Sequence, residues 1–449
     1  MRTLLERAKG STLYIITNWD SPVGTLTLLS PHTAQIKYLT FEHNIWKDIQ
    51  KLSEVISGPL PLLHTLRINA VDDLDLGAFN VMTPPSLPLF TGAVNLKEFV
   101  LQSERSPFLH HFIFPNLTTF ELLAQPAEEG FSASKLLNFL EASPMLQTVH
   151  MKIVDEILLE DVPQERVVVL PNVKTFSLIV SDGGPGYEIA ARISCPSVRY
   201  TSFIHERDVP SATLEEMFVF PTLVPWSAIA HQYTKSPVEG VALDIMFSRD
   251  PTIACSITFQ SSDATVLKLG FQINESDGEE EFQMPFEEMH HQVFHQASRT
   301  IRYHPLLENV KRFDINHMAF VVDSNYSILL SEEVEQLFRS VGPLEELTAF
   351  GCDLNLYFGP FSKPPESHSL TALPSVKRLT ISHPSYKRSK ELCMAAIVEL
   401  AKSRHALGIP FEHLTVCMER LPKVMAERLE PWVGAADCRE EMEPDYDYY

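Results

Sequence analysis

One short apolar pattern recurs thirteen times along this chain, and it constrains the fold more than any other feature. The pattern is apolar-x-x-apolar-x-apolar, as in Leu96-x-x-Phe99-x-Leu101. Its last two apolar residues sit two apart, so in a strand they point to the same face. An apolar signature that returns every 20 to 50 residues marks a repeat architecture. The first apolar residues of the copies are Ile36, Leu63, Leu96, Leu117, Leu146, Val173, Val198, Val238, Val266, Val310, Leu344, Val376 and Phe411.

The pattern predicts an α/β, leucine-rich-repeat-like solenoid of about 13 irregular repeats. Parallel strands would line the concave face, with helices and loops outside. The gaps between copies run from 21 to 44 residues, which favours irregular connections. We expect one continuous domain over residues 1–439, with capping regions at 1–35 and 419–439. Residues 440–449 are acidic and rich in tyrosine, and a disordered tail is expected there. Residues 205–235 fit the repeat least well.

The residues between the copies support the same assignment of strand positions. A proline precedes several strands, as in Phe114-Pro115-Asn116, and it would end a helix and set an extended entry to the strand. Helical spacing or capping residues predict helices between strands. The predicted helices cover residues 45–56, 132–142 (with Ser132 as N-cap), 331–340 and 389–407 (closing at Gly408).

Composition narrows the function classes. The chain has 449 residues and a formal net charge of −22, which argues against nucleic-acid binding because that needs a basic footprint. Six scattered cysteines form no C-x-x-C pair and predict free thiols in a reducing compartment. The sequence shows neither a signal peptide nor an apolar stretch of membrane-spanning length. An intracellular location, cytoplasmic or nuclear, is expected, with no membrane partner.

Two local motifs have the residue types for chemistry. If the segment from Phe286 is helical, His291 and His295 lie one turn apart, with Glu287 one turn before His291. That is a possible metal-ligand spacing, but the segment is not H-E-x-x-H and no third ligand is evident. The glycine-rich run 181–187 lacks the G-K-[ST] ending of a phosphate loop. We therefore predict no catalytic residue, no metal and no cofactor.

The polar residues that flank the last two apolar positions form the candidate site. A parallel sheet would expose them as a ladder suited to extended protein recognition. The usual asparagine three places after the last apolar residue is mostly missing, and only Asn44 and Cys352 occupy that position. A single regular ladder of inner turns is therefore not expected. The predicted partner-binding residues are Arg67, Asn69, Glu98, Glu121, His150, Lys152, Arg312, Asp314, Asn316 and Arg378.

The chain resembles fungal, basidiomycete-type F-box proteins with irregular leucine-rich-like repeats. The resemblance rests on the repeats, on Leu4-Leu-Glu-Arg-Ala followed by Ser11-Thr-Leu-Tyr-Ile, and on Leu429-Glu-Pro-Trp-Val-Gly. In that family the F-box recruits the adaptor of a cullin-RING ubiquitin ligase and the repeats hold the substrate. Strand-like sequence begins near Thr12 here, which leaves no room for the three F-box helices ahead of the repeats. The similarity implies a substrate-receptor arm, and adaptor binding would depend on an F-box located upstream.

The sequence leaves three alternative functions open. The first is a non-catalytic protein-protein recognition module that resembles the substrate-binding repeats of an F-box protein and binds an unidentified protein substrate. The second is a stand-alone repeat scaffold or adaptor unrelated to ubiquitination. The third, and least favoured, is a metal-dependent enzyme that uses the histidine-rich segment around His291.

Overall fold

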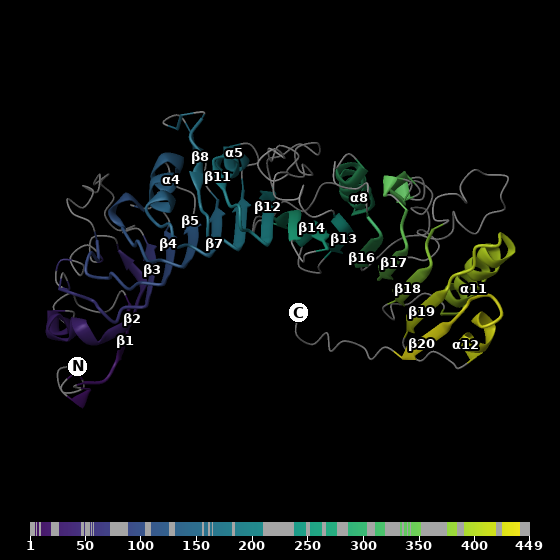
Figure 1. Cartoon of the computed structure of the whole chain (residues 1–449), viewed down its shortest axis with the longest axis horizontal. Helices are drawn as coiled ribbons and strands as arrows, with labels where there is room; N and C mark the ends of the chain where they lie inside the picture. Colours follow the sequence, from purple (N-terminus) through teal and green to yellow (C-terminus); the bar gives the residue numbers. More distant parts are fainter. Residues whose placement is uncertain are drawn as a thin grey trace. The chain divides into compact units, whose positions relative to one another are not determined.

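The computed structural model shows an α/β protein whose main sheet contains sixteen strands, most of them parallel (Figure 1). The chain divides into two compact units. Unit 1 comprises Met1–His205 and Leu223–Gln232, and unit 2 comprises Glu206–Thr222 and Tyr233–Tyr449. Apart from isolated residues, the structure describes residues 10–18, 27–45, 58–71, 89–103, 109–124, 131–154, 157–159, 162–163, 165–181, 185–209, 238–247, 252–262, 266–275, 286–302, 310–318, 333–334, 336–338, 340–341, 343–351, 375–383, 390–418 and 424–440.

The strands of unit 1 are all parallel, and each pairs with the next one in this order. They are β1 (Leu13–Asn18), β2 (Ile36–Ile45), β3 (Thr65–Val71), β4 (Glu98–Ser103), β5 (Thr119–Ala124), β7 (Thr148–Ile153), β10 (Thr175–Val180) and β12 (Tyr200–Val209), which begins in this unit. The connections hold η1 (Thr27–Gln35), η2 (Leu109–His111), α4 (Ala133–Glu141) and α5 (Pro185–Ala191). Two small parallel pairs lie outside the main sheet: β6 (Phe131–Ser132) with β8 (Ile157–Leu158), and β9 (Val168–Val169) with β11 (Ile193–Ser194).

The prolines before these strands form turns rather than extended entries, which corrects one expectation. In each case the amide of the first apolar residue of a repeat donates to the carbonyl three residues earlier, as Leu117 does to Phe114 at 3.1 Å. Pro115 then occupies the second position of a β-turn, where its fixed φ is favoured. The same bond closes the turns 60–63, 93–96, 143–146, 170–173 and 195–198. The strand begins two residues after the turn closes.

Asparagine side chains link successive turns, although not at the position where regular leucine-rich repeats carry them. The third turn residue donates its side-chain amide to the carbonyl of the second residue of the preceding turn. Asn116 reaches Val94 in this way at 2.9 Å, Asn95 reaches Pro61 at 2.9 Å and Asn172 reaches Pro144 at 3.1 Å. A partial asparagine ladder therefore exists on the entry side of the strands.

A backbone ladder fixes the spacing of the strands just before they begin. The carbonyl of Lys97 accepts hydrogen bonds from the amides of both Thr118 and Thr119, each at 2.9 Å. The same double acceptance recurs along unit 1, and unit 2 repeats it where Lys311 accepts from Glu345 at 2.7 Å and from Glu346 at 2.9 Å. Because these bonds join corresponding residues, the repeats are held in register.

An aromatic cluster fills the core of unit 1 beneath β4 and β5. The ring of Phe99 lies 4.9 Å from Phe112, 5.2 Å from Phe114 and 5.9 Å from Phe120, measured between centroids. Phe139 of α4 closes the cluster, 4.5 Å from Phe120. All five side chains are buried. Ser132 caps α4 as predicted, because its side chain accepts from the amide of Lys135. Figure 1 shows α4 and α5 on one side of the strands of unit 1.

Unit 2 departs from the all-parallel expectation at its start. Strands β13 (Val238–Phe247), β14 (Thr252–Ser261) and β15 (Val266–Glu275) pair antiparallel, β13 with β14 and β14 with β15. Parallel pairing resumes from β13 through β16 (Arg312–Met318), β17 (Glu346–Phe350), β18 (Arg378–His383), β19 (His413–Met418) and β20 (Ala436–Glu440). The prediction of parallel repeats throughout was therefore wrong for β13 to β15.

The copy of the pattern at Val266 shows why the sequence pattern predicted a parallel repeat strand where the structure has an antiparallel one. Val266 is half-buried, whereas Leu267, Leu269 and Phe271 are all buried, so β15 alternates with a period of two from its second residue. A strand of a simple antiparallel hairpin buries one face in this way. Leu269 and Phe271 reproduce the last two positions of the repeat pattern by that alternation alone.

The helices of unit 2 are α8 (Phe286–Arg302), α11 (Lys390–Ala406) and α12 (Val424–Leu429). Helix α11 confirms the predicted helix 389–407. Gly408, at φ +77°, ends it, and the amide of Ile409 donates back to the carbonyl of Arg404. The predicted helix 331–340 is described at only some residues, and most of 46–57 lies outside the described residues, while Ile45 ends β2.

The chain ends correspond only partly to the expectations. The predicted tail was to begin at residue 440, but Glu440 closes β20, and residues 441–449 lie outside the description. The predicted capping region 419–439 contains α12 and most of β20. Residues 210–237, which include most of the segment 205–235 that fits the repeat least well, all lie outside the described residues, and the single-domain expectation stays a prediction. Within the described part of the chain, no helix is long and apolar enough to cross a membrane.

Candidate recognition surface

All ten predicted site residues lie on strands, at positions that alternate with buried core residues. Arg67 and Asn69 are on β3, Glu98 on β4, Glu121 on β5, His150 and Lys152 on β7, Arg312, Asp314 and Asn316 on β16, and Arg378 on β18. None of the ten is buried. The face opposite the core therefore carries them in each unit, as the repeat pattern predicts.

In unit 1 the structure brings some of these residues together. A terminal nitrogen of Arg67 lies 2.7 Å from the Glu98 carboxylate on the neighbouring strand, and the other oxygen of Glu98 accepts from the Thr65 hydroxyl at 3.2 Å. Glu121 on β5 is in register with His150 on β7. Glu98 is thus partly neutralised, which leaves it less free to repel an acidic ligand.

In unit 2 the predicted residues pair with acidic neighbours. Both Nε and a terminal nitrogen of Arg312 donate to Asp314, two residues along the same strand, at 2.8 and 2.6 Å. These hydrogen bonds and the charge of Asp314 raise the pKa of Arg312. Arg378 pairs with Glu346 on the neighbouring strand. In unit 2 these exposed arginine and carboxylate side chains therefore neutralise one another's charge.

The sequence analysis missed most residues at the two positions directly after the first apolar residue of each repeat. Of its candidates, only Glu98, Arg312 and Arg378 occupy the second of these positions. The first position forms what we term the basic row of unit 1, and the backbone ladder aligns it from strand to strand. The second forms the hydroxyl row, which is paired in register from β2 to β12. The basic row is Lys37, His64, Lys97, Thr118, Gln147, Lys174 and Arg199. The hydroxyl row is Tyr38, Thr65, Glu98, Thr119, Thr148, Thr175 and Tyr200, and Glu98 is its one member without a hydroxyl.

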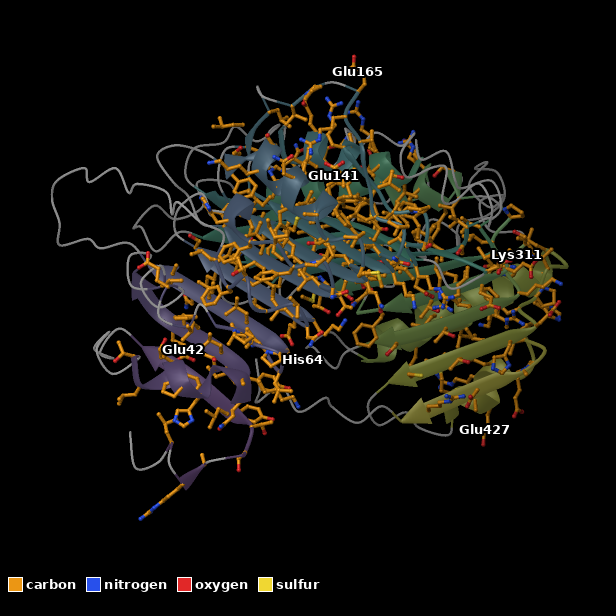
Figure 2. The ribbon with its side chains drawn as sticks, turned by 60° about the vertical axis from the view of Figure 1, so that its left-hand side comes forward. Glu42, His64, Glu141, Glu165, Lys311 and Glu427 are labelled. Carbon is orange, nitrogen blue, oxygen red and sulfur yellow. The ribbon has the colours of Figure 1, made fainter. Side chains whose placement is uncertain are left out.

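A sequence signal for these rows exists. Copies of the pattern in unit 1 read apolar-basic-Thr or apolar-basic-Tyr at Val173-Lys174-Thr175 and Val198-Arg199-Tyr200. The predicted site included no residue directly after the first apolar position, and it took only charged residues from the next position. The members of the basic row directly precede their strands or, as with Lys37, lie at the start of one, so the row follows the rim where the strands begin. One member, His64 just before β3, is labelled in Figure 2.

The corresponding positions of unit 2 alternate in sign. They are Glu239, Lys311, Glu345, Lys377 and Glu412, joined by the same backbone ladder. The ammonium of Lys377 lies 3.3 Å from the carboxylate of Glu412 on the next strand. One backbone arrangement therefore presents a basic row in unit 1 and a self-neutralising row in unit 2.

Exposed aromatic and apolar side chains gather on β1 and β2. Tyr14 stacks on Tyr38 with centroids 4.5 Å apart and an interplanar angle of 13°, and the ammonium of Lys37 lies 5.5 Å from the Tyr38 centroid. Tyr14 is 62% exposed and Ile16 is 68% exposed. Tyrosine combines apolar area with a hydrogen-bonding hydroxyl, which suits it to contact surfaces.

One described residue of the histidine-rich segment and one of the glycine-rich run make contacts in the folded chain. His295 Nδ1 lies 2.9 Å from the carboxylate of Glu333, an ion-pair geometry, while the side chains of Glu287 and His291 lie outside the described part. No group of three or more metal-ligating side chains occurs among the described residues. In the glycine-rich run, the carbonyl of Ser181 contacts His205 Nε2 at 2.9 Å.

Two cysteines are poorly suited to nucleophilic chemistry because burial disfavours their thiolates. Burial raises the pKa of Cys195 to about 12. Burial, helped by the charge of Asp244, raises the pKa of Cys255 well above its usual value. The nucleophilic form of cysteine is the thiolate, so burial makes both positions unfavourable for a nucleophile.

Comparison with known proteins adds no assignment: no protein-family model matches the chain, and no curated protein has a significantly similar sequence.

Proposed function

We propose that this protein is a non-catalytic protein-recognition module built as a leucine-rich-repeat-like solenoid. The observation that carries the proposal is the set of exposed side chains held in register on successive parallel strands. In unit 1, strands β3, β4, β5, β7 and β10 pair residue for residue with no register shift. A rigid backbone that presents ordered polar rows needs little rearrangement to bind an extended partner.

The repeated turn, ladder and strand support the solenoid interpretation. In both units a carbonyl just before one strand accepts two amides from the next repeat, as at Lys97 and Lys311. Each repeat then contacts its neighbours through the same bonds, which is how a solenoid is stabilised. The antiparallel strands β13 to β15 are an interruption of this arrangement.

The resemblance to F-box proteins suggests what kind of partner to seek. On that proposal the repeats hold a protein substrate, and a cullin-RING ligase adaptor binds only if an F-box lies upstream. A scaffold unrelated to ubiquitination is the alternative. Adaptor binding by the longest natural form of the chain distinguishes the two, since only a ligase receptor requires it.

Affinity capture with the full chain tests the recognition function. We expect one or a few proteins to copurify reproducibly, and the variant Arg67→Ala/His150→Ala/Lys152→Ala to lose them. A control variant, Lys135→Ala/Glu165→Ala, changes residues away from the exposed face of β3 to β7 and should retain them. Figure 2 shows Glu165, with Glu141, at the side of unit 1 far from His64. Capture that is equally strong with both variants would contradict this placement of the binding surface.

A further inference from the structure

We propose that the basic row of unit 1 docks an acidic, extended polypeptide segment that runs across the strands. The inference rests on the proposed recognition function and specifies the chemistry of the partner. Four residues of the row are lysine or arginine: Lys37, Lys97, Lys174 and Arg199. The row contains no acidic residue.

The backbone gives this row a defined length and spacing. The carbonyls of Lys37, His64, Lys97, Thr118, Gln147 and Lys174 each accept the amide of the next member of the row. Neighbouring strands are about 4.8 Å apart, so the seven positions span about 29 Å. An extended chain advances about 3.3 Å per residue, so a segment of about nine residues would cover the row.

The positive charges of the row are not neutralised by the described carboxylates. The ammonium of Lys97 donates to the carbonyl of Asn116 at 3.2 Å, and that of Lys37 lies over the Tyr38 ring. Lys174 and Arg199 directly precede the neighbouring strands β10 and β12, and like charges at adjacent positions repel each other. The corresponding row of unit 2 avoids that cost by alternating its signs, as at Lys377 and Glu412. Charge left uncompensated on a chain with a net charge of −22 points to an acidic partner.

The adjacent hydroxyl row favours a polypeptide over other polyanions. Thr119, Thr148 and Thr175 stand in register on three strands and can exchange hydrogen bonds with peptide amides and carbonyls. Tyr38 and Tyr200 bracket them and supply apolar contact area. A long nucleic acid or an anionic membrane would also meet the strong negative charge of the rest of the chain, which a short acidic segment avoids.

Fluorescence anisotropy with defined peptides tests the proposal. The probe is a labelled ten-residue peptide of alternating Glu and Ser, with alternating Gln and Ser as its neutral counterpart. The row variant is Lys97→Gln/Lys174→Gln/Arg199→Gln, and the charge-matched control in unit 2 is Lys311→Gln/Lys377→Gln/Lys402→Gln. Thermal melting checks the fold of both, and the row variant should be no less stable because like charges are removed.

We expect the acidic peptide to bind the unmodified chain, and its Kd to rise with added salt because exposed charges are screened. The row variant should raise Kd tenfold or more, and the control less than twofold. Absence of binding, or an equal effect of both variants, would overturn the proposal. Tighter, row-dependent binding of a single-stranded oligonucleotide or of anionic lipid vesicles would overturn the polypeptide assignment.

These results remain separable from the recognition function itself. If captured proteins depend on Arg67, His150 and Lys152 but not on the row variant, the recognition function stands and the acidic-segment inference fails. If the control variant Lys135→Ala/Glu165→Ala abolishes capture while the peptide still depends on the row, the placement of the wider binding surface fails instead.

Discussion

Units 1 and 2 share a backbone design but differ in what they expose. Each has a carbonyl before the strand that accepts two amides from the next repeat, and each buries the same positions of the apolar pattern. At the position of that carbonyl, unit 1 presents Lys97, Lys174 and Arg199, whereas unit 2 alternates, as at Lys377 and Glu412. The difference teaches that core and ladder determine the scaffold, while the exposed rows are free to vary.

The aromatic core of unit 1 provides the largest expected effect. The change Phe99→Ala should lower the free energy of unfolding by about 3–5 kcal/mol, because it removes a buried ring that contacts Phe112, Phe114 and Phe120. Urea denaturation followed by circular dichroism measures the loss. Phe99→Leu is the matched control and should cost less, because it fills more of the cavity.

Unit 2 sharpens that comparison. Phe313 is also buried, but its described aromatic contact is a single edge-on approach to Phe338 at 6.0 Å. Phe313→Ala should therefore destabilise less than Phe99→Ala in the same denaturation experiment. An equal or greater loss for Phe313→Ala would show that the aromatic cluster does not distinguish the two cores.

The asparagine ladder predicts a smaller effect, confined to unit 1. Asn116→Ala removes the hydrogen bond to the Val94 carbonyl and should cost about 1 kcal/mol. Asn116→Asp retains the shape but not the donor and should cost a similar amount. Amide hydrogen exchange should show faster opening around residues 93–117. Unchanged exchange there would mean that the turns hold without their side-chain links.

The charge rows predict effects of opposite direction in the two units. Glu346→Gln breaks the pair with Arg378 and should destabilise unit 2 by up to about 1 kcal/mol, the range of exposed ion pairs. Lys174→Gln removes a like-charge neighbour of Arg199 and should leave the melting temperature unchanged or slightly higher. Melting curves at low and high salt measure both, and the difference should shrink as salt rises. A destabilising Lys174→Gln would mean that the basic row has a structural role.

The smallest expected effect is a pH dependence in unit 1. Burial, and then the charge of Lys135, lower the pKa of His111 below 6.5. The unfolded chain therefore binds the proton at higher pH than the native state does, and the free energy of unfolding decreases as pH falls below about 6.5. The drop in melting temperature from pH 7 to pH 5 should be smaller in His111→Gln than in the unmodified chain. The exposed control His150→Gln should reduce that drop less than His111→Gln does.

Much of the local structure could be predicted from sequence because it depends on nearby residues. The capping by Ser132, the helix end at Gly408 and the burial of Leu66, Phe99 and Val149 all follow short-range patterns. The turn conformation at Pro115 was mistaken for an extended entry. Proline is compatible with both conformations, and the hydrogen bond that decides between them appears only in the folded chain.

The candidate surface was predicted in part for the same reason. Alternation placed Arg67 and Lys152 on the exposed face, but the pairing of Arg67 with Glu98 joins residues 31 apart in sequence. The basic row was missed because it becomes a row only when the ladder aligns Lys97, Lys174 and Arg199 across strands. Register between distant strands is set by long-range hydrogen bonds, which a local pattern does not contain.

The sequence by itself determined which residues face the core, since an apolar side chain lowers its free energy by leaving water wherever its strand lies. It also determined where prolines separate several of the repeats, although not the conformation that each proline adopts. Only the tertiary structure decided which strands are neighbours and in which direction they run. The antiparallel order of β13, β14 and β15 shows this, because period-two burial is the same in either direction and backbone pairing alone distinguishes them.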